Sequence, residues 1–238
     1  MVGVEEVRRR VAGVDGLRED RKHAHWNQFT LLDIMTAMTT LGLLACLTLA
    51  QSATYFPVDE KRGVSSFEEE WYGKALKALD EKPLHTDADA TKGTVYRLTI
   101  LPTWGNPVTV RLTVLEGKAT IEGKRLDGQG GYEPGKLVEK GLTPVSAETL
   151  ATFEKLFAKV NFEKQTTRDP TRGLDGSQYI LERVTEGKYH VVVRWSPDSD
   201  PQKRGLSAFL AASQSLYRAS PLKKDVTNKG RVELRKSE

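Results

Sequence analysis

The sequence predicts an α+β domain with one antiparallel sheet, because period-two alternation and helical spacing occupy separate stretches of the chain. Two stretches alternate between apolar and polar residues, and each is interrupted by a Glu-Gly pair, Glu116-Gly117 and Glu186-Gly187. Glycine accepts a positive φ at no steric cost, so each pair predicts a tight hairpin turn. The expected order α-β-β-β-α-β-β-α gives about five strands built from hairpins, with helices packed mainly on one face.

The first helix is expected to begin at Ser66, because Glu69 stands three residues later, as in a capping box. Pro83 should end this element. Its expected buried stripe follows at helical spacing: Phe67, Trp71, Ala75, Ala78 and Leu79. Residues 54–65 are expected to form a tether, and residues 66–219 a single domain.

The first alternating stretch begins at Thr94 and continues through Val108 to Val114 after a connection at residues 102–107. Its Glu-Gly turn places Arg111 opposite Glu122, which predicts a cross-strand ion pair. Residues 127–141 are expected to form a Gly-rich loop. A second helix should open at Thr143-Pro144 or Ser146, with its apolar stripe at Leu150, Phe153, Leu156, Phe157 and Val160.

A loop at residues 163–177 leads to the second hairpin, with strands at 178–184 and 189–195. Asp200-Pro201 is expected to cap the last helix. The buried stripe of that helix should be Leu206, Phe209, Leu210, Leu216 and Tyr217. Residues 220–238 are predominantly basic and are expected to form a mobile tail.

The second hairpin presents two different faces. One face should be core, and it holds Ile180, Val184, Tyr189, Val191, Val193 and Trp195. Glu182 lies among these apolar residues, opposite Val191, and a buried carboxylate needs a partner or a raised pKa. We therefore expect a charge partner for Glu182 or an elevated pKa.

The other face of this hairpin carries the candidate ligand-binding residues Tyr179, Arg183, His190 and Arg194. The turn places Tyr179 opposite Arg194, and Arg183 opposite His190. Two guanidiniums, an imidazole and a phenol on one strand face could hold an anionic ligand. The alternative is a solvated face on which the arginine stems lie along the sheet.

An apolar segment predicts export from the cytoplasm. Residues 34–50 form 17 positions without a charge, preceded by a polar extension over residues 1–33 that carries several arginines. We interpret residues 34–53 as a signal peptide or a membrane segment. The arginines lie mostly before the segment, which would direct the C-terminal bulk outward. The expected location is the bacterial periplasm or cell envelope, with the chain attached to the membrane.

Three forms of export remain open. Leu43-Leu44-Ala45-Cys46 resembles the lipobox of bacterial lipoproteins, in which the cysteine becomes the lipidated first residue, so Cys46 is the lipidation candidate. The segment could also be an uncleaved anchor, or it could be cut after the small-x-small triplet at residues 50–52.

Composition excludes several other classes. The net charge of +4 argues against a nucleic-acid partner, and the single cysteine excludes an internal disulfide framework or a cysteine-based zinc cluster. Residues 130–136 match seven positions of a phosphate-binding loop, but Leu137 stands where the magnesium-binding hydroxyl is required. We therefore expect no cofactor, no metal and no catalytic residue of a recognised motif.

Four stretches resemble segments of an uncharacterised family of bacterial secreted proteins and lipoproteins. They are YRLTILPTWGNPVTVRL, GQGGYEPGKL, DGSQYILE and YHVVVRWSP, and the resemblance covers roughly residues 67–218. It implies bacterial origin and export, but no activity and no catalytic residues.

The leading hypothesis is an exported, non-enzymatic domain that is held at a membrane by an N-terminal lipid or anchor and binds a protein partner or an anionic ligand. The alternative is a small envelope hydrolase that uses Glu182 or His190 with Arg194. Catalytic groups must converge within hydrogen-bond reach, so a pocket that unites these residues with Asp175 would favour the enzyme.

Overall fold

A computed structural model describes residues 54–59 and 62–223 of the chain, all within one compact unit. Its six-stranded antiparallel sheet has the order β4-β3-β2-β1-β5-β6. The strands are β1 (Thr94–Pro102), β2 (Val108–Leu115), β3 (Lys118–Leu126), β4 (Leu137–Val145), β5 (Ser177–Thr185) and β6 (Lys188–Trp195). The predicted α+β class is confirmed, with one strand more than expected.

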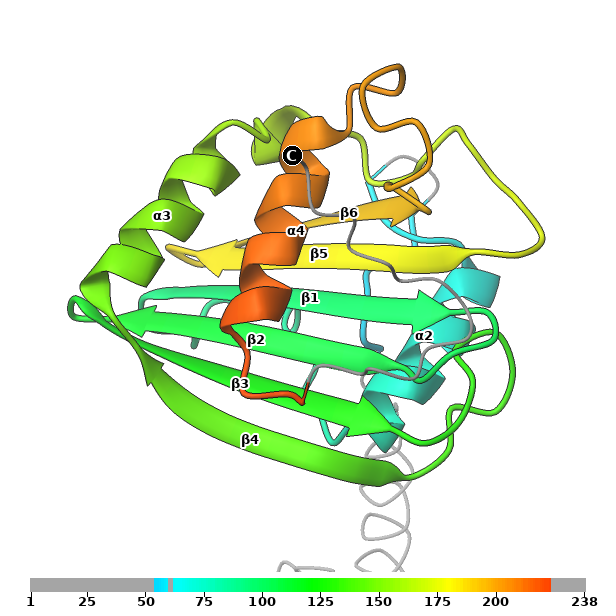
Figure 1. Ribbon diagram of the computed structural model, residues 1–238, viewed down its shortest axis with the longest axis horizontal. Coiled ribbons are helices and arrows are strands. Elements are labelled where there is room, and N and C mark those ends of the chain that lie inside the picture. The colour runs from blue at the N-terminus through cyan, green and yellow to red at the C-terminus, as the bar shows by residue number, and fades with distance from the viewer. Residues whose placement is uncertain (1–53, 60–61, 224–238) are drawn as a thin grey trace, which may run out of the picture. The chain divides into compact units, whose positions relative to one another are not determined.

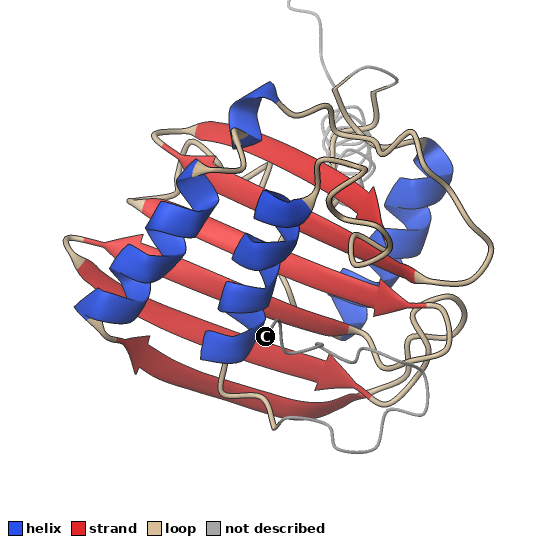
Figure 2. Cartoon of the chain, turned by 45° about the horizontal axis from the view of Figure 1, so that its top comes forward, coloured by secondary structure: helices blue, strands red, loops and turns tan. Residues whose placement is uncertain are grey.

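The sheet is covered on both faces. Helices α3 (Ala147–Ala158) and α4 (Ser207–Ala219) lie side by side on one face, and α2 (Ser66–Ala78) lies on the other (Figures 1 and 2). A short 3₁₀ turn, η1 (Phe162–Lys164), follows α3. Two of the three α-helices in the described residues therefore share one face, and alternate side chains of the central strands are buried on both faces.

The larger core lies beneath α3 and α4. Tyr96 of β1 meets the rings of Phe153 and Phe157 of α3 edge-on, with centroid distances of 4.9 and 4.8 Å. Phe209 and Leu216 of α4 belong to the same buried cluster. Edge-to-face packing brings the positive edge of one ring to the negative face of another, so these contacts add specific geometry to the burial of apolar area.

The smaller core lies beneath α2 and corrects two sequence predictions. The N-cap of α2 is Ser65, which forms the capping box with Glu68, one residue before the expected box. The buried positions of α2 are Tyr72, Gly73, Ala75 and Leu76 instead of the predicted stripe, and Phe67 is 70% exposed. Phe56 and Val64 are fully buried in this core, so the expected tether at residues 54–65 contributes side chains to the domain.

Both hairpins have the predicted register. Arg111 pairs with Glu122 across β2 and β3, and Tyr179 pairs with Arg194 across β5 and β6. Both glycines of the Glu-Gly turns have positive φ, +75° at Gly117 and +73° at Gly187. The turn chemistry therefore fixes the strand pairing, as expected.

The sixth strand, β4, occupies part of the predicted Gly-rich loop at residues 127–141. Its residues alternate only between exposed and half-exposed, because it lies at the edge of the sheet. Gly141 pairs with Gly123, and a Cβ atom at either glycine would lie within 3 Å of Pro221 or Leu222. The strand prediction relied on alternation between buried apolar and exposed polar residues. Because β4 buries neither face, its sequence lacks this alternation.

The helix starts are partly as predicted. Ser146 caps α3 by accepting a hydrogen bond from the Thr149 amide at 3.1 Å. Asp200-Pro201 does not cap α4, which begins at Ser207. The carbonyls of these two residues instead accept hydrogen bonds from the amides of Arg204 and Leu206, which forms a turn before the helix.

The domain extends past the expected boundary at residue 219. Leu222 is 7% exposed and belongs to the core beneath α3 and α4. The Lys223 amide donates to Glu139 of β4 at 2.6 Å, and the Lys223 carbonyl accepts from Arg125 at 2.6 Å. The start of the predicted mobile tail is thus part of the folded unit.

We expect Leu222→Ala to lower the free energy of unfolding by about 2–3 kcal/mol, because the substitution removes a buried side chain and leaves a cavity. Leu174→Ala is the matched control, since Leu174 is 98% exposed and its truncation should change stability by less than about 0.5 kcal/mol. Urea unfolding of the full chain measures both values. Equal stability of the two variants would contradict the placement of Leu222 in the core.

Candidate functional site

The four predicted ligand-binding residues lie on the sheet face that α3 and α4 cover. Tyr179 and Arg194 are each 4% exposed, and Tyr179 belongs to the core on that side. His190 meets the ring of Phe162 edge-on, with a centroid distance of 5.1 Å. Arg183 forms an ion pair with Glu163 and lies over the ring of Phe157. Tyr179 and Arg194 therefore lie beneath the helices and not on a solvated surface, whereas Arg183 and His190 are half-buried.

Arg194 connects β6 to the loop that follows η1. Its guanidinium donates to the carbonyls of Thr166 and Thr167 at 3.1 and 3.4 Å, and to the side-chain oxygen of Gln165 at 2.8 Å. The Val193 amide donates to the Thr167 carbonyl at 2.7 Å. These bonds hold the loop along the edge of the sheet, which satisfies backbone groups that an edge strand would otherwise expose.

The residues of the hydrolase hypothesis do not converge. Glu182 points to the α2 face, whereas His190 and Arg194 point to the opposite face, because successive side chains of a strand alternate. The Asp175 carboxylate accepts a hydrogen bond from Trp104 at 3.1 Å. This set of groups therefore forms no catalytic constellation.

Glu182 has the charge partner that its burial requires. Arg97 of β1 pairs with it directly across the strands, and both side chains are fully buried. The guanidinium donates twice, from Nε to Oε2 at 2.6 Å and from Nη2 to Oε1 at 2.7 Å. The Tyr189 hydroxyl donates to the same carboxylate at 3.0 Å. Burial and the Glu182 charge raise the pKa of Tyr189 well above its ordinary value, so the phenol stays a donor.

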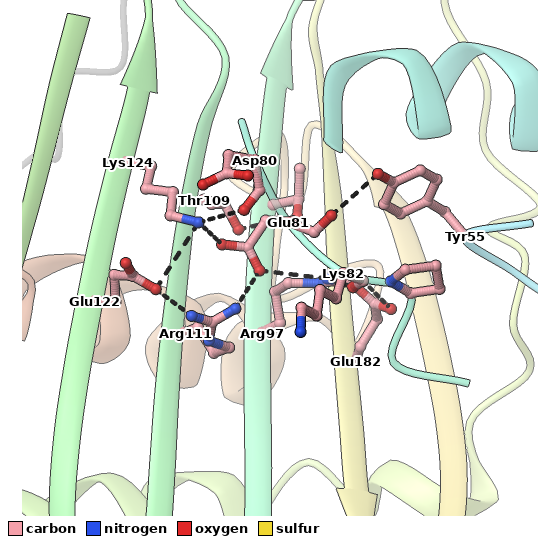
Figure 3. Close-up of polar contacts among 12 residues, drawn as sticks. Tyr55, Asp80, Glu81, Lys82, Arg97, Thr109, Arg111, Glu122, Lys124 and Glu182 are labelled. Carbon is pink, nitrogen blue, oxygen red and sulfur yellow. Dashed lines mark hydrogen bonds and ion pairs between the residues drawn. The ribbon is translucent and has the colours of Figure 1, made fainter. Parts of the chain in front are cut away.

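This pair belongs to a row of charges across four strands, which Figure 3 shows from the α2 side. Arg97 pairs with Arg111 of β2, and Arg111 pairs with Glu122 of β3, to which it also donates a hydrogen bond. The predicted Arg111–Glu122 ion pair is thus confirmed. Two like charges directly opposite each other are destabilising, so the Arg97–Arg111 pair requires a counter-charge.

Glu81 supplies this counter-charge from the connection between α2 and β1. One of its carboxylate oxygens lies 2.6 Å from Arg111 and 3.4 Å from Arg97, and the other lies 2.7 Å from Lys124 (Figure 3). Arg97 also donates to the carbonyl of Lys82, and Lys124 to that of Asp80. We call these side chains the buried charge cluster: Glu81, Arg97, Arg111, Glu122, Lys124 and Glu182.

The buried charge cluster fixes the end of α2 to the sheet. Removing charges from water is costly, and the cost is offset only where every charge finds well-placed partners. A displaced Glu81 would leave Arg97, Arg111 and Lys124 short of negative charge. The cluster therefore favours one position of the connection at residues 79–83 on the sheet.

A second polar feature is a cleft of about 180 Å³ between the first turns of α2, the loop at residues 168–173 and the ends of β5 and β6. We call it the α2 cleft. Its walls combine polar residues with four aromatic side chains, those of Phe67, Trp71, Tyr72 and Trp195. The indole of Trp71 is oriented by a hydrogen bond from Nε1 to the Gly130 carbonyl at 2.6 Å.

Two glycines let the loop pass close to the indole of Trp195. A Cβ atom at Gly173 would lie 2.1 Å from that ring, and one at Gly176 would lie 2.7 Å from its Nε1. Only residues without a side chain fit at such an approach. The loop therefore lies against the indole and forms one wall of the α2 cleft.

The carboxylates that line the cleft are engaged in structural bonds. Glu68 accepts from the amide and hydroxyl of Ser65 at 2.8 Å each and forms an ion pair with Arg168 at 3.4 Å. Asp169 accepts from Arg204 at 2.6 Å, from the Trp195 amide at 3.0 Å and from the Thr171 amide at 2.9 Å. Each negative charge thus has a cation beside it.

Two donors in the cleft remain without such partners. The side chain of Tyr72 is buried, and its hydroxyl forms no hydrogen bond with any residue that the structure describes. Burial raises the pKa of Tyr72 far above its ordinary value, so its hydroxyl keeps the proton. Arg172 is exposed at the cleft and forms no hydrogen bond or ion pair within the described ranges. The α2 cleft thus offers two donors to a ligand.

Within residues 54–59 and 62–223, no group of three or more His, Cys, Asp and Glu side chains is arranged to hold a metal ion. No helix in the same ranges is long and apolar enough to cross a membrane. Cys46 and the expected signal peptide or membrane segment at residues 34–53 lie outside the described residues.

Comparison of the chain with models of protein families, with curated proteins and with solved structures finds no match in any of the three. The structure and its chemistry are therefore the basis for a functional proposal.

Sequence reasoning identified Glu182 but missed Glu81, Tyr72 and Arg172. Glu81 lies in a polar run, Asp80-Glu81-Lys82, that gives no sign of burial. Tyr72 is next to the predicted stripe, which was assigned to the neighbouring face of α2. Arg172 lies in a loop with no periodicity, so no local signal marked it.

We expect Glu182→Gln to lower the free energy of unfolding by about 3–5 kcal/mol, because Arg97 then keeps a buried charge without its main counter-charge. The double variant Arg97→Met/Glu182→Leu should lose less than the sum of its two single variants, since it removes both charges. Chemical unfolding of the unsubstituted chain, Arg97→Met, Glu182→Leu and the double variant gives the coupling energy, and Glu182→Gln is measured beside them. Strict additivity would contradict the role of the pair.

Lys74→Ala is the control for that series. It breaks the Lys74–Glu133 pair, whose side chains are 52% and 84% exposed. Water screens such a pair, so the substitution should change the free energy of unfolding by about 1 kcal/mol or less.

We expect His190 to make the protein less stable in mild acid. Burial lowers the pKa of its imidazole below the ordinary 6.5, although the Gln165 carbonyl and Glu163 act in the opposite direction. The unfolded chain then binds a proton at a higher pH than the folded one, so stability is full above about pH 6.5 and falls as the pH drops through the folded value. His190→Gln should show a smaller loss of stability between pH 7 and pH 5, measured by urea unfolding. Parallel curves for the two proteins would contradict this.

Proposed function

We propose that this chain is an exported, envelope-associated and non-enzymatic α+β domain, attached to a bacterial membrane by an N-terminal lipid or anchor, that binds a partner or ligand. Export is supported by the 17 uncharged residues at 34–50 and by the lipobox-like tetrapeptide that ends at Cys46. The expected resident location is the periplasm or the cell envelope.

The observation that carries the binding role is the α2 cleft. Ligand sites are concave and mostly apolar, with a few polar groups that fix orientation. The α2 cleft has four aromatic side chains in its walls, and its Tyr72 and Arg172 donors form no hydrogen bond with described residues. A binding role without catalysis is favoured because Glu68 and Asp169, the carboxylates in the cleft, already accept two or more hydrogen bonds or ion pairs each. A general acid or base needs to be available to the substrate.

The buried charge cluster supports the same proposal, because it holds α2, which forms one wall of the cleft, in a fixed position. It holds the C-terminal end of α2, and the capping box of Ser65 and Glu68 holds the N-terminal end beside the cleft. A binding site that is already in place loses little conformational freedom when it takes its ligand. The cleft is therefore suited to binding without rearrangement of α2.

Mass measurement tests the export proposal. The full chain is expressed in a bacterial host, the cells are fractionated, and the intact mass of the membrane-extracted protein is determined. We expect a mature N-terminus at Cys46 with added acyl mass, because the lipobox-like tetrapeptide places the cut before this cysteine. Several acyl chains would hold the protein at the membrane, whereas a single chain binds only marginally. A retained Met1 in the membrane fraction would identify an anchor, and an N-terminus at Ala53 would identify a cleaved product. An unprocessed chain in the cytosolic fraction would overturn export.

Cys46→Ser distinguishes lipidation from anchoring. A lipoprotein variant should leave the membrane fraction or accumulate as the uncleaved precursor, whereas an anchored protein should not respond. Thr48→Ser is the matched control within the same apolar segment, and it should behave like the unsubstituted chain.

A further inference from the structure

The net charge of the α2 cleft follows from its pairs. Glu68 is paired with Arg168, and Asp169 with Arg204, so these four charges cancel locally. Arg172 is a further cation at the cleft and has no such counterpart among the described residues. The net charge of the residues at the cleft is therefore positive, which favours an anionic ligand.

Tyr72 supplies a second donor at the α2 cleft. Tyr72 and Arg172 both line the cleft, and the charge of Arg172 acts to lower the pKa of Tyr72 against the larger effect of burial. A protonated phenol and a guanidinium are both hydrogen-bond donors, and neither is bonded within the described part of the chain. Two donors at one cleft match a carboxylate, which has two acceptor oxygens.

The size and walls of the cleft indicate the rest of the ligand. A cavity of about 150 Å³ is known to accommodate benzene, so the cleft volume of about 180 Å³ corresponds to one six-membered ring with a small substituent. Trp71, Trp195 and Phe67 provide flat apolar surfaces around this space. These aromatic side chains favour a ligand whose ring presents a broad apolar face, because such a face makes extensive contact with an aromatic ring.

We propose that the α2 cleft binds a six-membered ring that carries a carboxylate, with Arg172 and Tyr72 holding the carboxylate and the aromatic side chains contacting the ring. Two chemical sources share these features: an aromatic carboxylate and an acidic sugar. This inference rests on the proposed binding function and names its ligand class.

Binding of four small probes to the full chain tests this proposal. Benzoate represents the aromatic carboxylates and glucuronate the acidic sugars, and benzamide and glucose are their uncharged counterparts. Titration calorimetry, supported by the fluorescence of Trp71 and Trp195, gives the affinities. We expect at least one acid to bind about tenfold more tightly than its uncharged counterpart, and the acid that does so identifies the source.

Three variants connect binding to the named residues. Arg172→Gln should weaken binding of the acid about tenfold or more, and Tyr72→Phe should weaken it several-fold, because each removes one donor to the carboxylate. Lys118→Gln is the matched control, since Lys118 is an exposed cation at the β2–β3 turn and should leave the affinity unchanged. Arg172 is exposed, so its variant should unfold at the same temperature as the unsubstituted protein.

The proposal is overturned if neither acid binds, if acid and uncharged counterpart bind equally, or if Arg172→Gln retains full affinity. Each of these results leaves the proposed export and membrane attachment standing, because mass measurement and fractionation test them independently. Conversely, a cytosolic, unprocessed chain that binds the acid would overturn export and support the ligand class.

Discussion

The ion pair between Arg97 and Glu182, with Glu81 beside it, is the interaction on which the arrangement of this domain depends. It joins β1 to β5, the pairing that connects the four strands β1–β4 to the β5–β6 hairpin in a single sheet. Arg97 also faces Arg111, and each has a carboxylate of the sheet beside it, Glu182 for Arg97 and Glu122 for Arg111. With Lys124 nearby, the three cations still exceed these two carboxylates by one charge. Glu81 compensates that charge, and it brings the end of α2 with it. The position of α2 is thus set by charge as well as by apolar contact.

The two faces of the sheet are held by different physical means. Beneath α3 and α4 the contacts are mainly aromatic and aliphatic, with Tyr96, Phe153 and Phe157 at the centre. Beneath α2 the apolar cluster is smaller and borders the buried charge cluster. Apolar packing tolerates many arrangements of similar energy, whereas a buried charge is satisfied by few. Fewer packing arrangements therefore satisfy the α2 side of the sheet than the opposite side. The α2 cleft lies on this side.

Sequence periodicity succeeded where both partners of a contact lie in one hairpin. The Glu-Gly turns fixed the pairing of Arg111 with Glu122 and of Tyr179 with Arg194, and both pairings are present. It failed where contacts join distant segments. The partner of Glu182 lies 85 residues away, and β4 has no buried face to mark it. The same contrast holds for the candidate site residues. The burial of Glu182 predicted that it needs a partner, but the sequence did not predict that distant elements cover Arg183 and Arg194.

The sequence by itself determined the α+β class, both hairpin registers and the apolar segment from which export is inferred, because each of these is written in neighbouring residues through turn chemistry or period. The tertiary structure alone decided which sheet face is covered by two helices, where Glu81 inserts, and which side chains gather at the α2 cleft. The physical reason is that these features arise from contacts between segments far apart in the chain. Local patterns show that a charge or an apolar face must be satisfied, and only the packed fold selects the group that satisfies it.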